Sequence, residues 1–190
     1  MSCSGGMRSF TATPKGDKMI ETERLLLRHP SAVDLPAWTV FLSEAEVTRF
    51  IGGPQDATGA WRNLCLFAGA WSVQGYSNFS VIEKATGRWI GRAGAWFPPG
   101  WVGPEIGWAF SRDVWGRGYA TEAATRCLIW AFEELGWMEA VHIIHPENYA
   151  SIAVAKRIGA IPRVSENAQK NLVYVTTREG WSPKDRATTG

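Results

Sequence analysis

The sequence predicts an α/β protein in which helices cover both faces of a mixed central sheet. Two observations lead to this class. Apolar residues recur at helical spacing in the first part of the chain and alternate as in strands from about residue 78. The expected order is a strand, two helices, three meandering strands, and then a helix, a strand, a helix and a strand. Meandering strands pair antiparallel, and the β-α-β-α-β order after them implies mixed pairing.

The chain begins with a predicted strand followed by two predicted helices. Residues 23–28 are a short, apolar-centred segment of the length expected for a strand. Residues 31–50 place apolar side chains at helical spacing, with Ser31 or Asp34 as the N-cap. Residues 57–74 repeat the helical spacing and end before a glycine, which is a common helix stop.

Three strands are expected after the second helix. Residues 78–83 and 89–97 flank the segment Lys-Ala-Thr-Gly at 84–87, which is typical of a hairpin turn. Residues 103–110 form the next strand, so that the three strands meander through the middle of the sheet.

The last third of the chain alternates helices with strands. Residues 120–135 form a helix with an apolar stripe, and Gly136 ends it. Residues 139–145 form a strand. Residues 148–158 form a short helix with an asparagine as N-cap and a glycine just past its end. Residues 172–178 form the final strand.

The composition is that of a soluble globular protein. A chain of 190 residues with 45% hydrophobic and 20% charged residues suits a single domain. Its 20 basic and 18 acidic side chains leave a net charge of +2, which is too small for the concentrated basic face of a nucleic-acid-binding protein. No run of ~18 apolar residues indicates a membrane span. We therefore expect neither nucleic acid nor a membrane as partner.

The termini and the cysteines suggest an ordinary cytoplasmic protein. Residues 1–18 lack the apolar core of a signal peptide, and three cysteines without CxxC spacing favour neither disulfides nor zinc. His142 and His145 stand at odd spacing on one predicted strand, so their side chains are expected on opposite faces and no metal site is expected. We predict one domain over 19–179 between flexible tails at 1–18 and 180–190.

The most informative stretch is Trp-Gly-Arg-Gly-Tyr-Ala-Thr at 115–121, between a predicted strand and the long helix. Gly116 and Gly118 let backbone amides approach a ligand closely, and the helix N-terminus adds positive charge, a combination that suits phosphate or pyrophosphate. Thr121 stands where a dinucleotide fingerprint needs its third small residue, and no lysine follows as a Walker loop requires. A tight turn without a ligand is the alternative.

The sequence of this stretch resembles the pyrophosphate loop of the GNAT superfamily of N-acetyltransferases, with Trp115 in place of the usual Gln or Arg. It is similar to the branch that includes the ribosomal-protein N-terminal (alanine) acetyltransferases. Three more segments resemble that branch in the same order, namely its opening strand at 20–28, the strand before the loop at 105–110, and the Asn-x-x-Ser helix at 148–160. The likeness extends over roughly residues 19–178.

The resemblance implies a GNAT-like fold, in which a largely antiparallel sheet is splayed between its fourth and fifth strands around acyl-CoA. It implies acetyl-CoA as cosubstrate and direct acetyl transfer in a ternary complex to a primary amine, on a protein N-terminus or a small molecule. The loop would hold the CoA pyrophosphate, while the preceding strand and the later helix would contact the pantetheine arm. The cofactor-binding residues implied in this way are Trp108, Ala109, Phe110, Trp115, Gly116, Arg117, Gly118, Tyr119, Ala120, Thr121 and Asn148.

Acetyl transfer to an amine needs a base and a proton for the leaving thiolate. Glu105 is the candidate base, because apolar neighbours such as Trp101 and Ile106 would raise its pKa; a solvent-facing strand carboxylate is the alternative. Many GNAT members place a proton-donating tyrosine where this chain has Ala155. The resemblance therefore points to Ser151 as the donor, and an ordinary first-turn serine is the alternative.

Other interpretations of the sequence stay open. The missing tyrosine also fits a non-catalytic acyl-CoA sensor on the same fold, and 11 tryptophans fit either a packed core, a substrate groove or a protein-interaction module. Tyr119 and Tyr149 are further candidate acids, although tyrosines of this kind more often serve packing. The acceptor stays open between a peptide N-terminus, a small amine and an amino sugar. The family also implies a homodimer, for which the sequence offers no interface.

Overall fold

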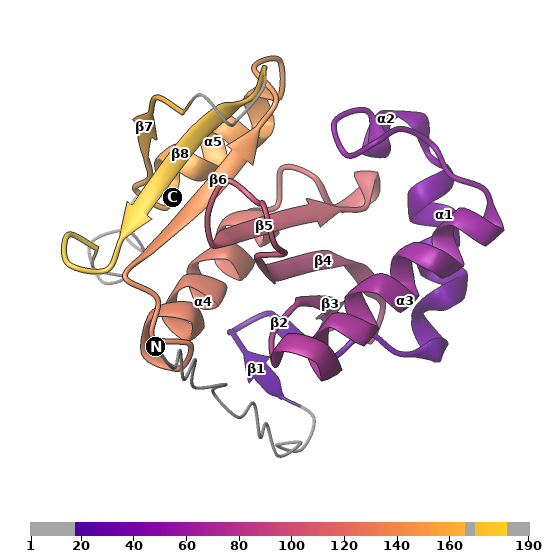
Figure 1. Cartoon of the computed structure of the whole chain (residues 1–190). Helices are drawn as coiled ribbons and strands as arrows, with labels where there is room; N and C mark the ends of the chain where they lie inside the picture. The colour runs from indigo at the N-terminus through magenta and orange to yellow at the C-terminus, as the bar shows by residue number, and fades with distance from the viewer. Residues whose placement is uncertain (1–17, 166–169, 182–190) are drawn as a thin grey trace, which may run out of the picture.

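The fold is an open sheet with helices on both faces, as Figure 1 shows for the computed structural model, which describes residues 18–165 and 170–181. Of the predicted tails at 1–18 and 180–190, only Lys18, Gly180 and Trp181 fall within the described residues. The ring of Trp181 packs edge-on against Phe132, and its indole nitrogen donates to the carbonyl of Ile158 over 2.8 Å. No helix within the described ranges is long and apolar enough to cross a membrane.

The described strands form one eight-stranded sheet in the order β1-β2-β3-β4-β5-β6-β8-β7. Every neighbouring pair is antiparallel except β5 and β6, which are parallel. This agrees with the predicted mixed, largely antiparallel sheet. The strands are β1 (Met19–Glu21), β2 (Leu25–Arg28), β3 (Asn78–Glu83), β4 (Trp89–Trp96), β5 (Glu105–Phe110), β6 (Glu139–Ile144), β7 (Ile161–Arg163) and β8 (Leu172–Thr177).

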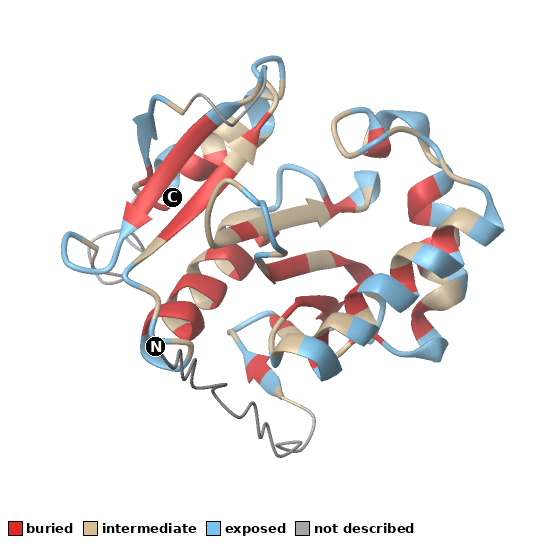
Figure 2. Ribbon diagram, in the orientation of Figure 1, coloured by how far each residue is buried: buried red, intermediate tan, exposed pale blue. Residues whose placement is uncertain are grey.

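The helices cover the two faces of the sheet and bury a separate apolar cluster on each (Figure 2). On one face Trp38, Phe41 and Phe67 pack beneath the first helices, and on the other Cys127 and Leu128 of the long helix pack on the central strands. The helices are η1 (Ala32–Asp34), α1 (Leu35–Ser43), α2 (Ala45–Thr48), α3 (Ala57–Gln74), η2 (Arg112–Val114), α4 (Tyr119–Glu133) and α5 (Tyr149–Arg157).

The sheet opens between β5 and β6, which correspond to the fourth and fifth predicted strands. The two strands register only through Glu105 opposite Val141, where the Val141 amide donates to the carbonyl of Pro104 over 2.8 Å. Beyond this point β6 turns away from β5 and pairs along its whole length with β8 (Figure 1). The predicted splay is therefore confirmed, and Glu105 stands at its vertex.

The structure departs from the predicted elements mainly near the N-terminus. Residues 31–50 are not one helix, because Glu44 is extended (φ −77°, ψ 113°) and separates α1 from α2. The first predicted strand begins later, at Leu25, because the Thr22 amide bonds to the Leu25 carbonyl and closes a turn. The strands β1 and β7 were not predicted, and each has only three residues.

Candidate active site

Glu105 faces a small cavity at the vertex of the splay. The indole nitrogen of Trp101 donates a hydrogen bond of 2.7 Å to its Oε2. Burial raises the pKa of the Glu105 carboxyl to about 7, while the Trp101 bond, the Ile143 amide and the charge of Arg92 act in the opposite direction. A carboxyl group with such a pKa exchanges its proton near neutral pH, as a general base must.

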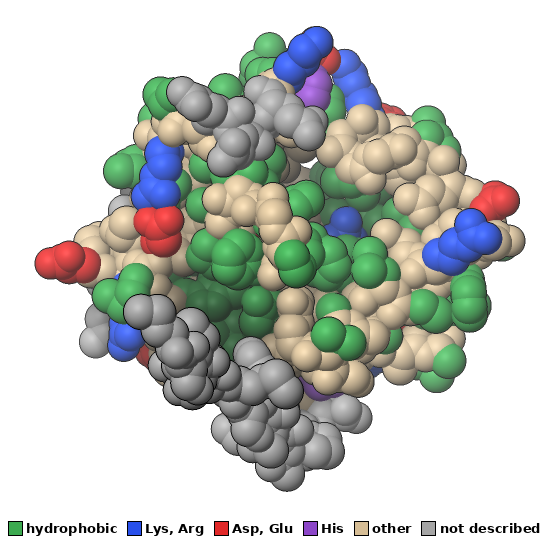
Figure 3. All heavy atoms as spheres, viewed as in Figure 1, with side chains coloured by type: hydrophobic (Ala, Val, Ile, Leu, Met, Phe, Trp, Pro, Cys, Tyr) green, Lys and Arg blue, Asp and Glu red, His purple; other side chains and the backbone are tan. Residues whose placement is uncertain are grey.

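The cavity has a volume of about 120 Å³ and lies between the central strands and the start of α5. Figure 3 shows the molecule hollowed between β6 and α2, with a basic side chain at the bottom of the hollow. The structure brings together at this cavity four of the predicted residues, namely Glu105, Trp108, Asn148 and Ser151. The remaining lining residues are Phe50, Ile51, Arg92, Ile106, Gly107, His142, Ile143, Ile144 and His145.

Asn148 and Ser151 approach the cavity from the first turn of α5. The side-chain oxygen of Asn148 caps the helix by accepting from the Ser151 amide over 3.1 Å. Neither the amide group of Asn148 nor the hydroxyl of Ser151 donates to any described residue. Asn148 thus acts as the predicted cap and keeps two donors for a ligand, while the Ser151 hydroxyl keeps its proton available.

His142 is a buried, neutral side chain in the wall of the cavity. Its Nδ1 lies 2.7 Å from the carbonyl of Ile106 and its Nε2 lies 3.0 Å from the Thr176 hydroxyl. A carbonyl only accepts, so Nδ1 has the proton and Nε2 accepts from the threonine. Burial lowers the pKa of His142 to about 4, although the bond to Ile106 acts in the opposite direction.

The two histidines of this segment both line the cavity, contrary to the expectation that they face opposite sides. The reason is that β6 ends at Ile144, so His145 belongs to the following turn and does not follow the strand alternation. Its ring stacks on Phe50 with 5.0 Å between the centroids. Among the described residues no group of three or more His, Cys, Asp or Glu is arranged to hold a metal ion.

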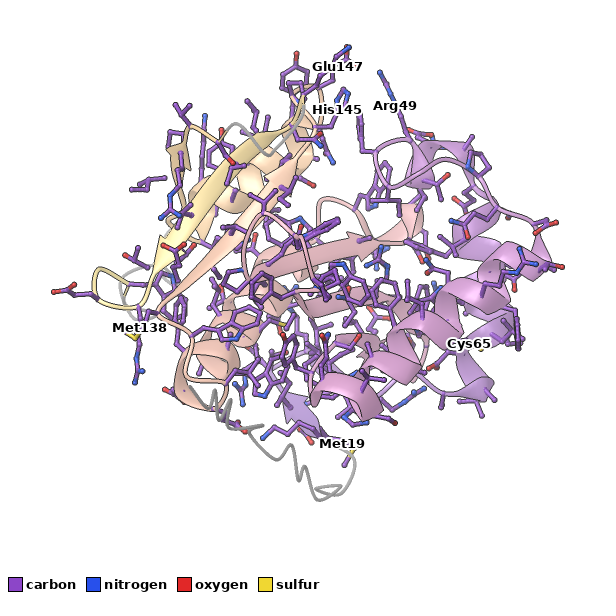
Figure 4. The ribbon with its side chains drawn as sticks, in the orientation of Figure 1. Met19, Arg49, Cys65, Met138, His145 and Glu147 are labelled. Carbon is purple, nitrogen blue, oxygen red and sulfur yellow. The ribbon has the colours of Figure 1, made fainter. Side chains whose placement is uncertain are left out.

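A pair of contacts bridges the open end of the splay above the cavity. The Phe50–His145 stack is one of them, and the other is an ion pair of 2.8 Å between Arg49 and Glu147. Figure 4 shows Arg49 opposite His145 and Glu147 at the top of the molecule. The segment after α2 thereby meets the turn before α5, and the two segments close one side of the cavity.

The glycine loop between η2 and α4 presents unpaired backbone amides. Gly116 and Gly118 have φ of 77° and 80°, in the left-handed region. The first hydrogen bond of α4 runs from the Glu122 amide to the Gly118 carbonyl over 3.1 Å. The amides of residues 116–121, which include the predicted Ala120 and Thr121, donate to no described residue. A helix start with several free amides is a favourable place for an anion.

Arg24, from the turn before β2, fixes the shape of this loop. Its Nη1 donates to the carbonyl of Arg117 over 2.9 Å, and its guanidinium lies 4.4 Å from the centre of the Tyr119 ring. The Tyr119 hydroxyl is buried and donates to Glu83 over 2.6 Å. That side chain is therefore engaged away from the cavity, and the Arg117 side chain remains exposed.

The edge of β5 beyond Glu105 has no ladder to β6. Ala109 is paired on its other side with Arg92 of β4, and the Trp108 ring lies 5.3 Å from the ring of His142. The carbonyl of Phe110 accepts from the indole nitrogen of Trp115 over 2.8 Å. This bond ties the end of β5 to the glycine loop, and Trp115 is still 47% exposed.

A second, more open hollow of about 730 Å³ lies between α1 and η2. None of the predicted site residues lines it. Two of its basic side chains are in ion pairs, Arg88 with Asp113 at 2.5 Å and Arg112 with Glu46 at 2.8 Å, and Glu44 also lines it. The smaller cavity brings four predicted site residues together and this hollow brings none, so the smaller cavity is the better candidate site.

Sequence reasoning missed several residues that line the smaller cavity, among them Arg92. For Arg92 a signal was present, because it is the only charged residue in the otherwise apolar and glycine-rich strand Trp89–Trp96. Phe50 is one of the aromatic residues of the first two predicted helices for which a substrate groove was an open interpretation, but its contact with His145 had no signal in the sequence.

Comparisons with known proteins fit this geometry. Residues 24–161 match the family model described as an acetyltransferase (GNAT) domain. The uncharacterized N-acetyltransferase p20 of Bacillus licheniformis is 31% identical over 161 residues, which cover 81% of this chain and 90% of that protein. The crystal structure of an acetyltransferase from Agrobacterium tumefaciens str. C58 superposes with a TM-score of 0.78 at 31% identity, covering 92% of this chain and all of that one. The fold is shared with Mycobacterium smegmatis RimJ, solved in complex with CoA-disulfide, at a TM-score of 0.66 and 20% identity over 82% of each chain.

Proposed function

The chain belongs to the GNAT family of acetyltransferases, and on this basis we propose that it transfers the acetyl group of acetyl-CoA directly to a primary amine, with Glu105 as base and Ser151 as proton donor. One observation carries the proposal. Glu105 and Ser151 line the same cavity from opposite sides of the gap between β5 and β6. The acceptor amine and the thioester would meet there.

The cosubstrate would lie in the gap of the sheet. The free amides of residues 116–121 suit its pyrophosphate, because they point their hydrogens toward an anion and cost nothing to unpair. The unpaired edge at Trp108 and the side chain of Asn148 suit the amide groups of the pantetheine arm. An amide on this edge would also polarise the thioester carbonyl.

The chemical step follows from these positions. The amine nitrogen attacks the carbonyl carbon of the thioester, a C–N bond forms, and the surplus proton of the amine passes to Glu105 directly or through water. The C–S bond then breaks, and the thiolate takes a proton from the Ser151 hydroxyl, which regains one from solvent. The pKa of Glu105, about 7, allows the carboxylate to accept that proton at neutral pH.

Ser151 is favoured as the donor over the tyrosines. Tyr119 is bonded to Glu83 inside the protein, and Tyr149 is 75% exposed and does not line the cavity. Ala155, where many GNAT members have a tyrosine, is fully buried against the core beneath α5. Ser151 lines the cavity and neither tyrosine does, so its hydroxyl is the better candidate for the proton donor.

The proposal is tested by measuring acetyl-CoA-dependent thiol release over a panel of peptides, amino acids, polyamines and amino sugars. With the best acceptor, we expect Glu105→Gln and Ser151→Ala to lower kcat by a factor of about 10² to 10⁴, the usual worth of a positioned acid or base. CoA binding by calorimetry should not change. Glu133→Gln and Ser43→Ala, both on the exposed surface, are the matched controls.

A different result would favour the sensor. If the protein binds CoA but acetylates no amine in the panel, the non-catalytic alternative stands and the roles given to Glu105 and Ser151 fall. If both variants acetylate an acceptor at the wild-type rate, the protein is an acetyltransferase but the assignment of Glu105 as base and Ser151 as proton donor is wrong.

A further inference from the structure

Arg92 is a half-buried cation that has no acidic partner among the described residues. It lies on β4 opposite Ala109, on the same face of the sheet as Glu105. Its Nη1 donates to the side-chain oxygen of Asn78 over 2.8 Å, and its guanidinium packs 4.5 Å from the centre of the Phe67 ring. Its Nε is buried with no hydrogen-bond partner, and it forms no ion pair with any described residue.

The other arginines of the central region are matched to acidic groups. Arg28 is paired with the buried Asp34 at 2.5 Å and Arg88 with Asp113 at 2.5 Å. Burial lowers the pKa of Arg92 to about 10, with the charge of Glu105 opposing the shift, so its guanidinium stays protonated at neutral pH. A charge that is largely withdrawn from water without an opposite charge is costly, and such a charge in a ligand pocket is accounted for when the ligand supplies the opposite charge.

The space around Arg92 favours a ligand group there. Glu105, Gly107 and Ala109 alternate along one face of β5, and a side chain at position 107 would meet only the Glu105 carboxyl, at 3.7 Å. Gly107 therefore leaves open space on this face of β5, between Glu105 and the position opposite Arg92. Arg92 is the only Lys or Arg among the residues that line the cavity, and Glu105 is the only acidic one.

We propose that Arg92 binds a carboxylate of the acceptor, so that the acceptor is a small primary amine that also bears a carboxylate, as an amino acid does. The ammonium end would face Glu105 and the carboxylate would face Arg92, which matches the two charges of a zwitterion to the two charged residues of the cavity. This inference rests on the proposed function in one respect, namely that the amine faces Glu105.

The size and the charge of the cavity argue against the other acceptor classes. A volume of about 120 Å³ admits a compact group, since a cavity of roughly 150 Å³ holds benzene. Polyamines and amino sugars bring further cations toward Arg92, which would repel them. A guanidinium with free N–H groups binds a planar carboxylate well.

The test compares each standard α-amino acid, β-alanine and γ-aminobutyrate with its own carboxamide, which has the same amine without the negative charge. We expect the wild-type enzyme to acetylate at least one free acid with a kcat/KM at least 100-fold above that of its amide. Arg92→Met should lower kcat/KM for the acid about 100-fold, as loss of a desolvated charge partner does. It should lower kcat/KM for the amide much less, through the loss of the Arg92 charge that acts on Glu105. Arg88→Met, an exposed arginine outside the cavity, is the control.

A binding measurement separates this inference from the assignment of the base. In Glu105→Gln protein loaded with CoA, calorimetry should still detect the preferred acid, and Arg92→Met in that background should abolish the signal. Retained turnover in Glu105→Gln with loss of acid preference in Arg92→Met would refute the base and leave the carboxylate site standing. Equal use of acids and amides by the wild type, or an equal loss for both in Arg92→Met, would refute the carboxylate site. Unchanged CoA affinity of Arg92→Met shows that the variant is folded.

Discussion

Trp101 holds the carboxyl of Glu105 through a hydrogen bond of 2.7 Å from its indole nitrogen. The tryptophan lies four positions before the acid and is 41% exposed, so the bond is made at the rim of the cavity and not in the core. It lowers the pKa of the carboxyl against the larger effect of burial. Trp101 is thus a positioning residue that sets both the direction and the acidity of Glu105.

Trp101→Phe should shift the pH dependence of the enzyme. Without the indole donor the pKa of Glu105 rises above about 7, so the carboxylate that accepts the amine proton forms only at higher pH. We expect the acidic limb of kcat/KM to move upward by about half a unit to one unit, the worth of one hydrogen bond. Trp61→Phe, an exposed tryptophan on α3, should leave the profile in place; an unmoved profile in Trp101→Phe would exclude the proposed influence.

Glu105 and His142 should have opposite effects on stability as pH falls. The pKa of His142 is lowered from 6.5 to about 4 in the folded state, so the unfolded chain binds the proton first and stability is lost between pH 6.5 and 4. The pKa of Glu105 is raised from 4.5 to about 7, so the folded state binds the proton first and stability is gained between pH 7 and 4.5. The two effects overlap and partly cancel in the wild type.

Single variants should separate these two effects in urea unfolding at pH 7 and pH 5. His142→Gln removes the loss of folding stability that protonation of His142 causes as pH falls. A pKa shift of this size corresponds to about 3 kcal/mol once the loss is complete, so this variant should be less sensitive to acid than the wild type. Glu105→Gln removes the gain of folding stability that protonation of Glu105 causes as pH falls, so this variant should be more sensitive to acid than the wild type. Parallel pH curves for the wild type and both variants would contradict the two pKa shifts.

Two substitutions at Gly118 should separate backbone strain from charge at the pyrophosphate loop. Gly118 has φ of 80°, and an added Cβ would lie 3.4 Å from Arg24, so Gly118→Ala should cost about 1 kcal/mol of folding free energy. Gly118→Glu has the same strain and adds a negative charge beside the expected pyrophosphate. We expect its CoA affinity to be at least tenfold below that of Gly118→Ala, with a gap that narrows as salt is added.

Equal CoA affinity of Gly118→Glu and the wild type would refute the pyrophosphate site. An equal loss in Gly118→Ala and Gly118→Glu would mean that the shape of the loop matters and its charge does not.

Phe50→Ala should weaken acceptor binding and leave CoA binding unchanged. The ring closes one side of the cavity by stacking on His145, and its removal opens that side to water. We expect KM for the acceptor to rise about tenfold with little change in the CoA Kd. Arg49→Ala removes an exposed ion pair with Glu147 and a guanidinium that lies 4.9 Å from the centre of the Phe50 ring, and it should change stability by less than about 1 kcal/mol. A KM that stays at the wild-type value in Phe50→Ala would show that the acceptor does not contact this wall.

The elements that the sequence predicted well are those in which apolar residues recur at regular spacing over many positions. Residues 57–74 were predicted as a helix, and α3 has the same bounds because its spacing and its glycine stop are both local signals. The splay was not accessible from periodicity, since it depends on how β5 and β6 diverge after one register pair. That feature came from the resemblance to a family.

What the sequence could not predict depends on neighbours distant along the chain. The break at Glu44 has no proline or glycine to announce it. Arg92 is half-buried by contacts with Asn78 and Phe67, so its unpaired charge becomes apparent only when those neighbours are placed. His145 joins the cavity because its strand ends one residue earlier, a boundary that side-chain alternation does not define.

The bond from Arg24 to the carbonyl of Arg117 spans 93 positions of the chain. The loop expected to receive the cosubstrate is therefore completed by a turn near the start of the described chain, after the intervening strands have assembled. A truncated polypeptide that has the loop but lacks residues 18–28 should leave Arg117 and the start of α4 unbraced. Affinity for CoA would then report whether the two ends of the sheet have come together, and the cosubstrate itself becomes a probe of how far folding has advanced.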